Sequence, residues 1–225
     1  IRRGETYLDY LEGDLAIVPA YTKEEIEAAV AEAHRCGLKA AAHCLGGIAM
    51  DDALEAGIDS LEHCNLMEER HIPLFLKAGA YVSDPNLILF FDPERGFESS
   101  ANKTHKWDDL PHWWHDKVRM AKDRTRTVLA KAAKEGVPFA LGTDLNHGLL
   151  WKEAKYFAKE LGATNMQAIQ AITKNGADLM GWGDTIGTIE AGKAADLVAV
   201  AGDPLSNIDH LERVRMVMKA GVREL

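Results

Sequence analysis

The sequence lacks a long apolar run, a paired set of cysteines and any long run of one charge sign. No stretch approaches the roughly 20 apolar residues that a membrane-spanning helix needs, so we expect no membrane partner. The net charge of −9 comes from dispersed acidic residues and disfavours nucleic acid as a partner. Three cysteines, an odd number, give no disulfide framework and fit a reducing compartment, so we expect a cytoplasmic location.

Two short stretches of the chain repeat one pattern at an offset of 20 residues. GLKAAAHC and GIDSLEHC each open on a glycine, continue through a short run and end on a His-Cys pair. These pairs are His43-Cys44 and His63-Cys64. Because a short apolar run after a glycine is typical of a strand that follows a helix, the repeat indicates two equivalent strands.

Two more runs of this kind follow, at 79–83 and 136–144, and helix-like segments precede the runs. Residues 22–25, Thr-Lys-Glu-Glu, match a capping box, and residues 114–134 carry apolar side chains at helical spacing. The order of helix, glycine and strand therefore occurs four times. It predicts a parallel sheet with helices outside, either doubly wound or a (β/α)8 barrel.

Strand periodicity separates the histidines from the cysteines. Successive side chains of a strand point to opposite faces, so a histidine and the cysteine after it cannot face one site. We expect Cys44 and Cys64 to pack under helices and His43 and His63 to face the mouth, where ligands gather in such folds. Asp144 ends the fourth run. Two histidines and a carboxylate from three strand ends indicate a zinc or other transition-metal site.

These motifs carry a family resemblance over nearly the whole chain. AAHCLGG at His43, DSLEHC at His63, ALGTDLNHG at Asp144, the helical text AIQAITKNGADLMG and the segment GTIEAGKAADLVAVAGDPL resemble the C-terminal half of the metal-dependent amidohydrolase superfamily. Its imidazolonepropionase-like and Xaa-Pro or Xaa-Arg dipeptidase-like members are the most similar. The resemblance implies an α/β fold that supplies strands five to eight of a (β/α)8 TIM-type barrel, together with part of a small β-sandwich.

The resemblance also implies a division of the chain. Residues 1–180 would form the partial barrel, with a long loop at about 84–111 on the active-site side, and residues 181–225 part of the β-sandwich. A connection as long as 84–111 is usually functional, and a disordered surface insertion is its other interpretation. The residue pattern of this last segment predicts a strand and tight turn at 187–193 and further strands at 195–200 and 214–219.

By the same resemblance, His43, His63 and Asp144 would bind one or two divalent metal ions, zinc by expectation. Asp144 would take a proton from the attacking water and deliver it to the leaving nitrogen. In one-metal members His63 would contact the water or the substrate instead, which gives it a catalytic role beside Asp144. His147, on the loop after Asp144, would contact the substrate or cap the loop.

We therefore expect a hydrolase of C–N amide bonds that acts on a small-molecule amide, such as a dipeptide or an N-acyl amino acid. An imidazolonepropionase-like cyclic amide hydrolase and a deaminase are the alternatives within the superfamily. Deaminases of this type tend to place a glutamate just after the strand-five histidine, whereas Cys44 follows His43 here, which favours amide hydrolysis. A non-catalytic binding or scaffold fragment is the alternative from another class.

Two motifs of the superfamily have no match in the chain. These are the His-x-His pair of strand one and the lysine of strand four that is often carboxylated. The chain thus resembles a fragment whose missing ligands lie upstream, and we expect the 225 residues alone to be inactive. Four barrel strands would leave two open edges and an exposed apolar inner face, which favour pairing with another chain, including a homo-oligomer.

Overall fold

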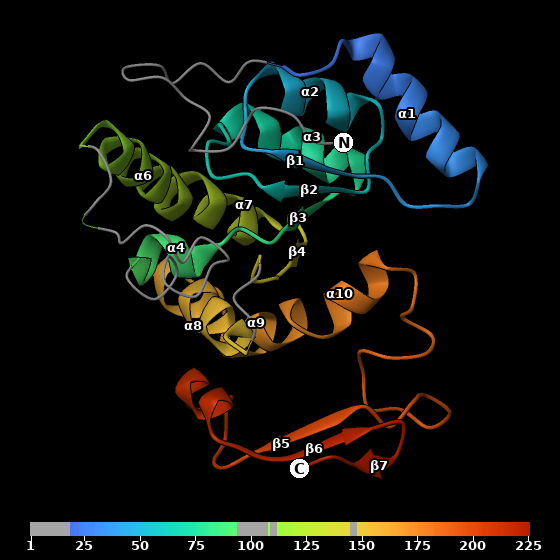
Figure 1. The fold of residues 1–225 in the computed structure, drawn as a ribbon, viewed down its shortest axis with the longest axis vertical. Helices are drawn as coiled ribbons and strands as arrows, with labels where there is room; N and C mark the ends of the chain where they lie inside the picture. The colour runs from blue at the N-terminus through green and yellow to red at the C-terminus, as the bar shows by residue number, and fades with distance from the viewer. Residues whose placement is uncertain (1–18, 94–107, 109–111, 145–147) are drawn as a thin grey trace.

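The structure is a computed structural model that describes residues 19–93, 108, 112–144 and 148–225. Its main sheet has four parallel strands in the order β1-β2-β3-β4. In Figure 1, α1 to α3 lie beside the β1–β2 half of the sheet and α8 to α10 lie beside β4. The strands are β1 (Ala41–Cys44), β2 (Ser60–His63), β3 (Tyr81–Ser83) and β4 (Phe139–Ala140).

The helices start and stop where local sequence signals lie. α1 begins at the expected capping box, in which the Glu25 amide donates to Thr22 Oγ1 at 3.3 Å. α3 and α7 end at Gly79 and Gly136, whose φ angles of 67° and 98° suit glycine. The described helices are α1 (Lys23–Arg35), α2 (Ile48–Glu55), α3 (Ile72–Ala78), α4 (Leu87–Phe91), α6 (His112–Arg124), α7 (Ala130–Glu135), α8 (Leu150–Leu161), α9 (Asn165–Ala171) and α10 (Lys174–Leu179).

Two expectations about the middle of the chain have different outcomes. The helix expected at 114–134 is confirmed as α6 and α7, joined by a π-helical turn at Thr125–Leu129. The expectation of a long loop at about 84–111 is wrong at its start, because α4 lies there and buries Leu87, Ile88 and Phe90. The rest of that segment lies almost entirely outside the described residues.

The two faces of the main sheet differ in chemistry. Partners in a parallel register share a face, so Leu61, Val82 and Phe139 lie on one side, and all three belong to the buried core. A second row of register partners lies on the other side and consists of His43, Glu62 and Ser83. The expected apolar inner face is therefore wrong for this row, because its side chains are polar.

The edge of β4 is partly covered within the described chain. The Leu141 amide donates to the Ala171 carbonyl at 2.9 Å, and Asn175 Nδ2 donates to the Phe139 carbonyl at 2.8 Å. These two main-chain groups of the β4 segment are thus satisfied by residues at the end of α9 and in α10. The two expected sheet edges are present in the described sheet as β1 and β4, and these contacts cover part of the β4 edge.

The C-terminal residues form a second, antiparallel sheet. Its strands are β5 (Leu197–Val200), β6 (Val214–Lys219) and β7 (Val222–Arg223). Of the strand and tight turn expected at 187–193, the turn is present and the strand is not, and the third strand of the described sheet is β7. Lys155 and Lys159 of α8 form ion pairs with Asp209, at 3.2 and 2.6 Å, which tie this region to the helices.

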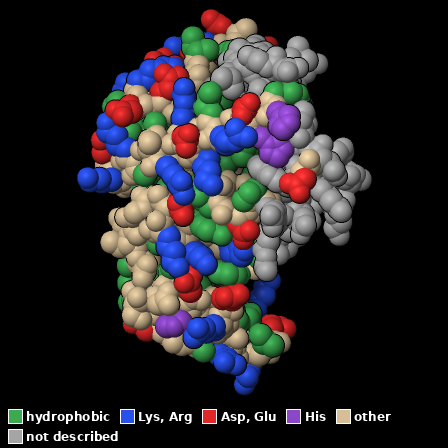
Figure 2. Space-filling model, turned by 90° about the vertical axis from the view of Figure 1, so that its left-hand side faces the viewer, with side chains coloured by type: hydrophobic (Ala, Val, Ile, Leu, Met, Phe, Trp, Pro, Cys, Tyr) green, Lys and Arg blue, Asp and Glu red, His purple; other side chains and the backbone are tan. Residues whose placement is uncertain are grey.

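The outer surface mixes charges of both signs. On the face shown in Figure 2, basic and acidic side chains are interspersed. Within the part of the chain that the structure describes, no helix combines the length and the apolar character that crossing a membrane requires.

Candidate metal centre at the carboxyl ends of the strands

Four polar side chains lie where the parallel strands end. His43 is the third residue of β1, His63 is the last residue of β2, and Asp84 directly follows β3. Asp144 follows β4 by four residues. Because the carboxyl ends of parallel strands meet at one edge, this arrangement brings all four toward one place.

The distances confirm that three of these side chains converge. One ligand atom from each of His63, Asp84 and Asp144 lies within 4.8 Å of the others. The imidazole ring of His43 contacts that of His63, with ring centroids 4.8 Å apart and an interplanar angle of 69°. The structure thus brings together the expected His43, His63 and Asp144 and adds Asp84 to them.

His63 reaches this group through an unusual backbone. In the sheet register, His63 pairs with Cys44 and His43 pairs with Glu62. The two histidines, which are equivalent in the sequence repeat, are therefore offset by one residue in the sheet. On alternation alone, His63 would share the face of Cys44. The φ angles of 75° at His63 and 58° at Cys64 are left-handed, and they redirect both side chains at the end of β2.

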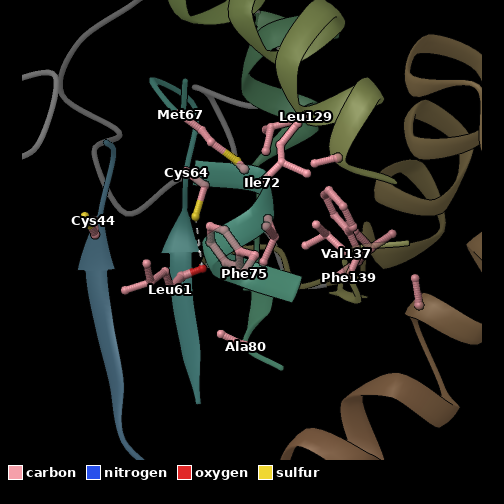
Figure 3. Packing of buried hydrophobic residues seen from close by; sticks show 14 of the residues in the cluster. Cys44, Leu61, Cys64, Met67, Ile72, Phe75, Ala80, Leu129, Val137 and Phe139 are labelled. Carbon is pink, nitrogen blue, oxygen red and sulfur yellow. Dashed lines mark hydrogen bonds between the residues drawn. The ribbon is translucent and has the colours of Figure 1, made fainter. Parts of the chain in front are cut away.

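The cysteines pack away from the site, as expected. Cys44 and Cys64 are buried in the main hydrophobic core, and Figure 3 shows Cys64 beside Leu61 and Phe75. The Cys64 thiol donates to the Leu61 carbonyl at 3.4 Å, and burial raises its pKa well above the usual value. Strand alternation explains why Cys44 points into the core, whereas the left-handed backbone at His63 and Cys64 explains why Cys64 does.

The surroundings of His63 define its protonation and its tautomer. Burial and the neighbouring His43 lower the pKa of His63 to about 4, although Asp144 and a backbone hydrogen bond oppose the shift. The ring is therefore neutral at pH 7. Its Nδ1–H donates to the Asp84 carbonyl at 2.9 Å, because a carbonyl only accepts. This bond leaves the Nε2 lone pair for a ligand, as in metal-binding histidines.

The Asp84 carboxyl group forms no ion pair with a basic side chain among the described residues. Burial, Asp144 and Glu62 raise the pKa of Asp84 to about 7, against the opposing effect of two backbone amides. Its Oδ1 atom is buried with no hydrogen-bond partner among the described residues. Gly142 leaves the space that Asp84 occupies, since a Cβ there would lie 3.1 Å from the Asp84 Cβ. An orphaned carboxylate oxygen beside a neutral imidazole fits a divalent cation.

A second buried carboxyl group lies behind the site. Glu153 of α8 is fully buried, and its carboxylate accepts the amides of Leu87 and Ile88 at 2.9 and 2.8 Å. Burial raises the pKa of Glu153 to about 8, and the charge of Asp84 adds to this shift.

Sequence reasoning missed both Asp84 and Glu153. The signal for Asp84 was its place directly after the third strand, which is the equivalent of the other site positions. The signal for Glu153 was a carboxylate next to the apolar stripe of an amphipathic helix. His147, expected to bind substrate, lies outside the described residues.

Comparison of the chain with known protein families gives a match over most of its length. Residues 8–223 match the model of the Amidohydrolase family. The chain belongs to the amidohydrolase family. Its α/β architecture and its strand-end His and Asp residues agree with that assignment, and members of this family are generally metal-dependent hydrolases.

A solved structure and a curated relative each match nearly the whole chain. The crystal structure of a Xaa-Pro dipeptidase with methionine bound in its active site is 34% identical, with a TM-score of 0.76, and the match covers 91% of this chain and 49% of that one. An uncharacterized protein of Mycobacterium tuberculosis is 26% identical over 219 residues, which are 96% of this chain and 55% of that protein. The chain thus spans about half the length of these relatives.

A third relative matches a shorter part of the chain. The imidazolonepropionase of Shouchella clausii is 38% identical over 106 residues, which cover 43% of this chain and 24% of that enzyme. Both kinds of similarity that the motifs indicated, to dipeptidases and to imidazolonepropionases, are therefore present.

Proposed function

We propose that this chain forms strands five to eight of the catalytic (β/α)8 barrel of a metal-dependent hydrolase that cleaves a C–N amide bond in a dipeptide or an N-acyl amino acid. The convergence of His63, Asp84 and Asp144, with the ring of His43 against His63, carries the proposal. The 34% identity to a Xaa-Pro dipeptidase supports a dipeptide as the substrate. In this proposal the remaining ligands come from the upstream half of the protein.

The residues present fit a zinc ion. Imidazole nitrogen and carboxylate oxygen are ligands that zinc accepts, and the Asp84 Oδ1 atom is buried without a hydrogen-bond partner among the described residues. His43 and His63 would hold the metal through ring nitrogens, and Asp84 and Asp144 through carboxylate oxygens. A bound divalent ion would polarise the amide carbonyl and lower the pKa of a bound water to roughly 7.

The protein side chains would move the protons of the reaction. Asp144 is the most exposed residue of the metal cluster, and in this proposal it faces both the attacking water and the substrate. Its carboxylate would accept a proton from the attacking water and deliver it to the leaving nitrogen as the C–N bond breaks. His63 would remain neutral, because burial and the neighbouring His43 lower its pKa to about 4, and its Nδ1–H would stay bonded to the Asp84 carbonyl. His147, three residues after Asp144 in the sequence, would contact the substrate.

The C-terminal sheet would serve a structural purpose. We propose that β5, β6 and β7 belong to a β-sandwich completed by other strands of the protein, within a segment that spans residues 181–225. The 62% exposure of Val198 supports this, since a side chain of that type on a strand is a candidate for burial by a second sheet.

The similarity to imidazolonepropionases supports a second candidate, the opening of a cyclic amide. The two reactions need the same metal chemistry and differ in the substrate, so substrate trials on the full-length protein separate them. Zinc-loaded protein should be assayed against Xaa-Pro dipeptides, other dipeptides, N-acyl amino acids and cyclic amides. Release of a free amino acid supports the first proposal, ring opening alone supports the second, and release of ammonia from a nucleobase without amide cleavage contradicts both.

A further inference from the structure

The turn between β3 and α4 supplies two groups to the metal centre. Asp84 contributes its side chain to the cluster and its carbonyl to the Nδ1–H of His63. The turn contains two non-glycine residues in left-handed conformations, Asp84 with φ 42° and Asn86 with φ 55°. Such conformations persist only where the surrounding structure holds them in place. The position of the metal ligands therefore depends on what holds this turn.

Buried side chains from other parts of the chain form hydrogen bonds to the main chain of the turn. Asn65 Nδ2 donates to the Pro85 carbonyl at 2.8 Å, and Asn65 itself is buried. At the far end of the turn, the Glu153 carboxylate accepts the amides of Leu87 and Ile88, which are the first two residues of α4. Together with the bond from His63, these contacts hold the main chain from the Asp84 carbonyl to the Ile88 amide.

Glu153 takes the capping role that a residue next to the helix usually fills. The first amides of a helix are ordinarily satisfied by the side chain at the N-cap, but Asn86 makes no such bond for α4. The acceptor comes instead from α8, more than 60 residues along the chain. Glu153 is fully buried, and no Lys or Arg of the described chain forms an ion pair with it. A buried carboxylate is a costly way to cap a five-residue helix.

We propose that Glu153 is a positioning residue of the metal centre: through the amides of Leu87 and Ile88 it holds the turn that presents the Asp84 carboxylate and fixes the tautomer of His63. The inference rests on the proposed metal centre and extends it to a side chain that contacts neither metal nor substrate. By holding the turn, Glu153 sets the position of Asp84 Oδ1 and keeps the lone pair of His63 on Nε2.

The Glu153→Gln variant of the full-length protein tests this role. The comparison is made above pH 8, where the Glu153 carboxyl group is ionised and both oxygens accept. Glutamine keeps the shape of the side chain, but its NH2 group faces an amide donor, so one of the two bonds is lost. We expect zinc affinity to fall roughly 10- to 100-fold, as for other residues that orient metal ligands. In the metal-free protein, nitrogen NMR of labelled histidines should show His63 changing from the Nδ1–H form to a mixture of tautomers.

Two control variants separate positioning from general packing. Glu160→Gln makes the same chemical change on α8 at the ion pair with Arg126, and it should leave zinc affinity and the His63 tautomer unchanged. Lys152→Met removes the ion pair with Asp92 just beyond the other end of α4, and it should lower thermal stability without changing the tautomer. Equal effects of Lys152→Met and Glu153→Gln on the tautomer would overturn the proposal, as would a Glu153→Gln protein with unaltered zinc affinity and tautomer.

A measurement on the unaltered protein covers the case in which Glu153→Gln does not fold. Coupling between two sites is reciprocal, so zinc binding should shift the amide resonances of Leu87 and Ile88. Unshifted resonances in zinc-saturated protein would overturn the proposal. The tautomer is read without substrate or metal, so failure of this inference is distinguishable from failure of the proposed amide hydrolysis, which appears only as absent turnover.

Discussion

His43 and His63 contact each other edge to face, with ring centroids 4.8 Å apart, although they are not partners in the sheet register. The contact exists because β2 ends in left-handed residues at His63 and Cys64. With burial, it helps to lower the pKa of His63 to about 4, which keeps the ring uncharged at neutral pH. An uncharged ring with its Nδ1–H already bonded is ready to bind a metal through Nε2.

Asp144→Asn should lower kcat by several orders of magnitude, on the order of 10³-fold, because the amide can neither accept the proton nor bind metal as well as a carboxylate. Steady-state kinetics on the full-length protein measures this. Asp116→Asn is the matched control, since Asp116 lies on the exposed side of α6 in a surface pair with Arg119, and its kcat should stay normal. Near-normal turnover of Asp144→Asn would remove this residue from the mechanism.

Asp84→Asn should stabilise the metal-free protein at alkaline pH. The pKa of Asp84 is raised from 3.8 to about 7, so the folded state binds this proton more tightly and loses stability as the pH rises through that interval. Above pH 7 the variant should be more stable by up to about 4 kcal/mol, and near pH 3.8 the two proteins should be alike. Urea unfolding in the presence of a chelator at both pH values provides the measurement.

Adding zinc should reverse this order. The metal binds the folded parent and raises its stability, whereas the Asp84→Asn protein lacks one ligand and gains less. A metal-free parent that is more stable than Asp84→Asn above pH 7, or an equal response of both proteins to zinc, would contradict the assignment of Asp84 to the metal centre.

Cys64→Ser should destabilise the fold without affecting zinc. The thiol lies in the hydrophobic core, and a buried hydroxyl there should cost about 1–3 kcal/mol. Thermal unfolding and metal analysis of the same samples test this. Cys36→Ser, at an exposed position, is the control and should change neither quantity. Loss of bound zinc from a Cys64→Ser protein of normal stability would instead make the thiol a ligand.

The features that sequence predicted are those with local causes. The capping box at Thr22, the glycine stops at Gly79 and Gly136 and the alternation of helix and strand each depend on residues a few positions apart. The sheet order follows from them, because helical crossovers between neighbouring parallel strands leave few topologies.

The features that sequence missed depend on distant contacts or on backbone conformation. Glu153 acquires its role only when α8 packs against α4, across more than 60 residues. The turn of His63 toward His43 depends on left-handed φ angles that no residue type at 63 or 64 signals. Asp84 had a readable signal at the strand end, but its segment was interpreted as the start of a long loop.

Zinc-dependent amide cleavage by the full-length protein is the most direct test of the account. The protein should be stripped of metal, reloaded with zinc and assayed against dipeptides, with bound zinc and released amino acid measured on the same sample. We predict that turnover is absent without metal, returns with one or two zinc ions per chain, and is lost again in Asp144→Asn. Full turnover in metal-free protein, or no amide cleavage by a zinc-loaded protein across dipeptides, N-acyl amino acids and cyclic amides, would contradict the account.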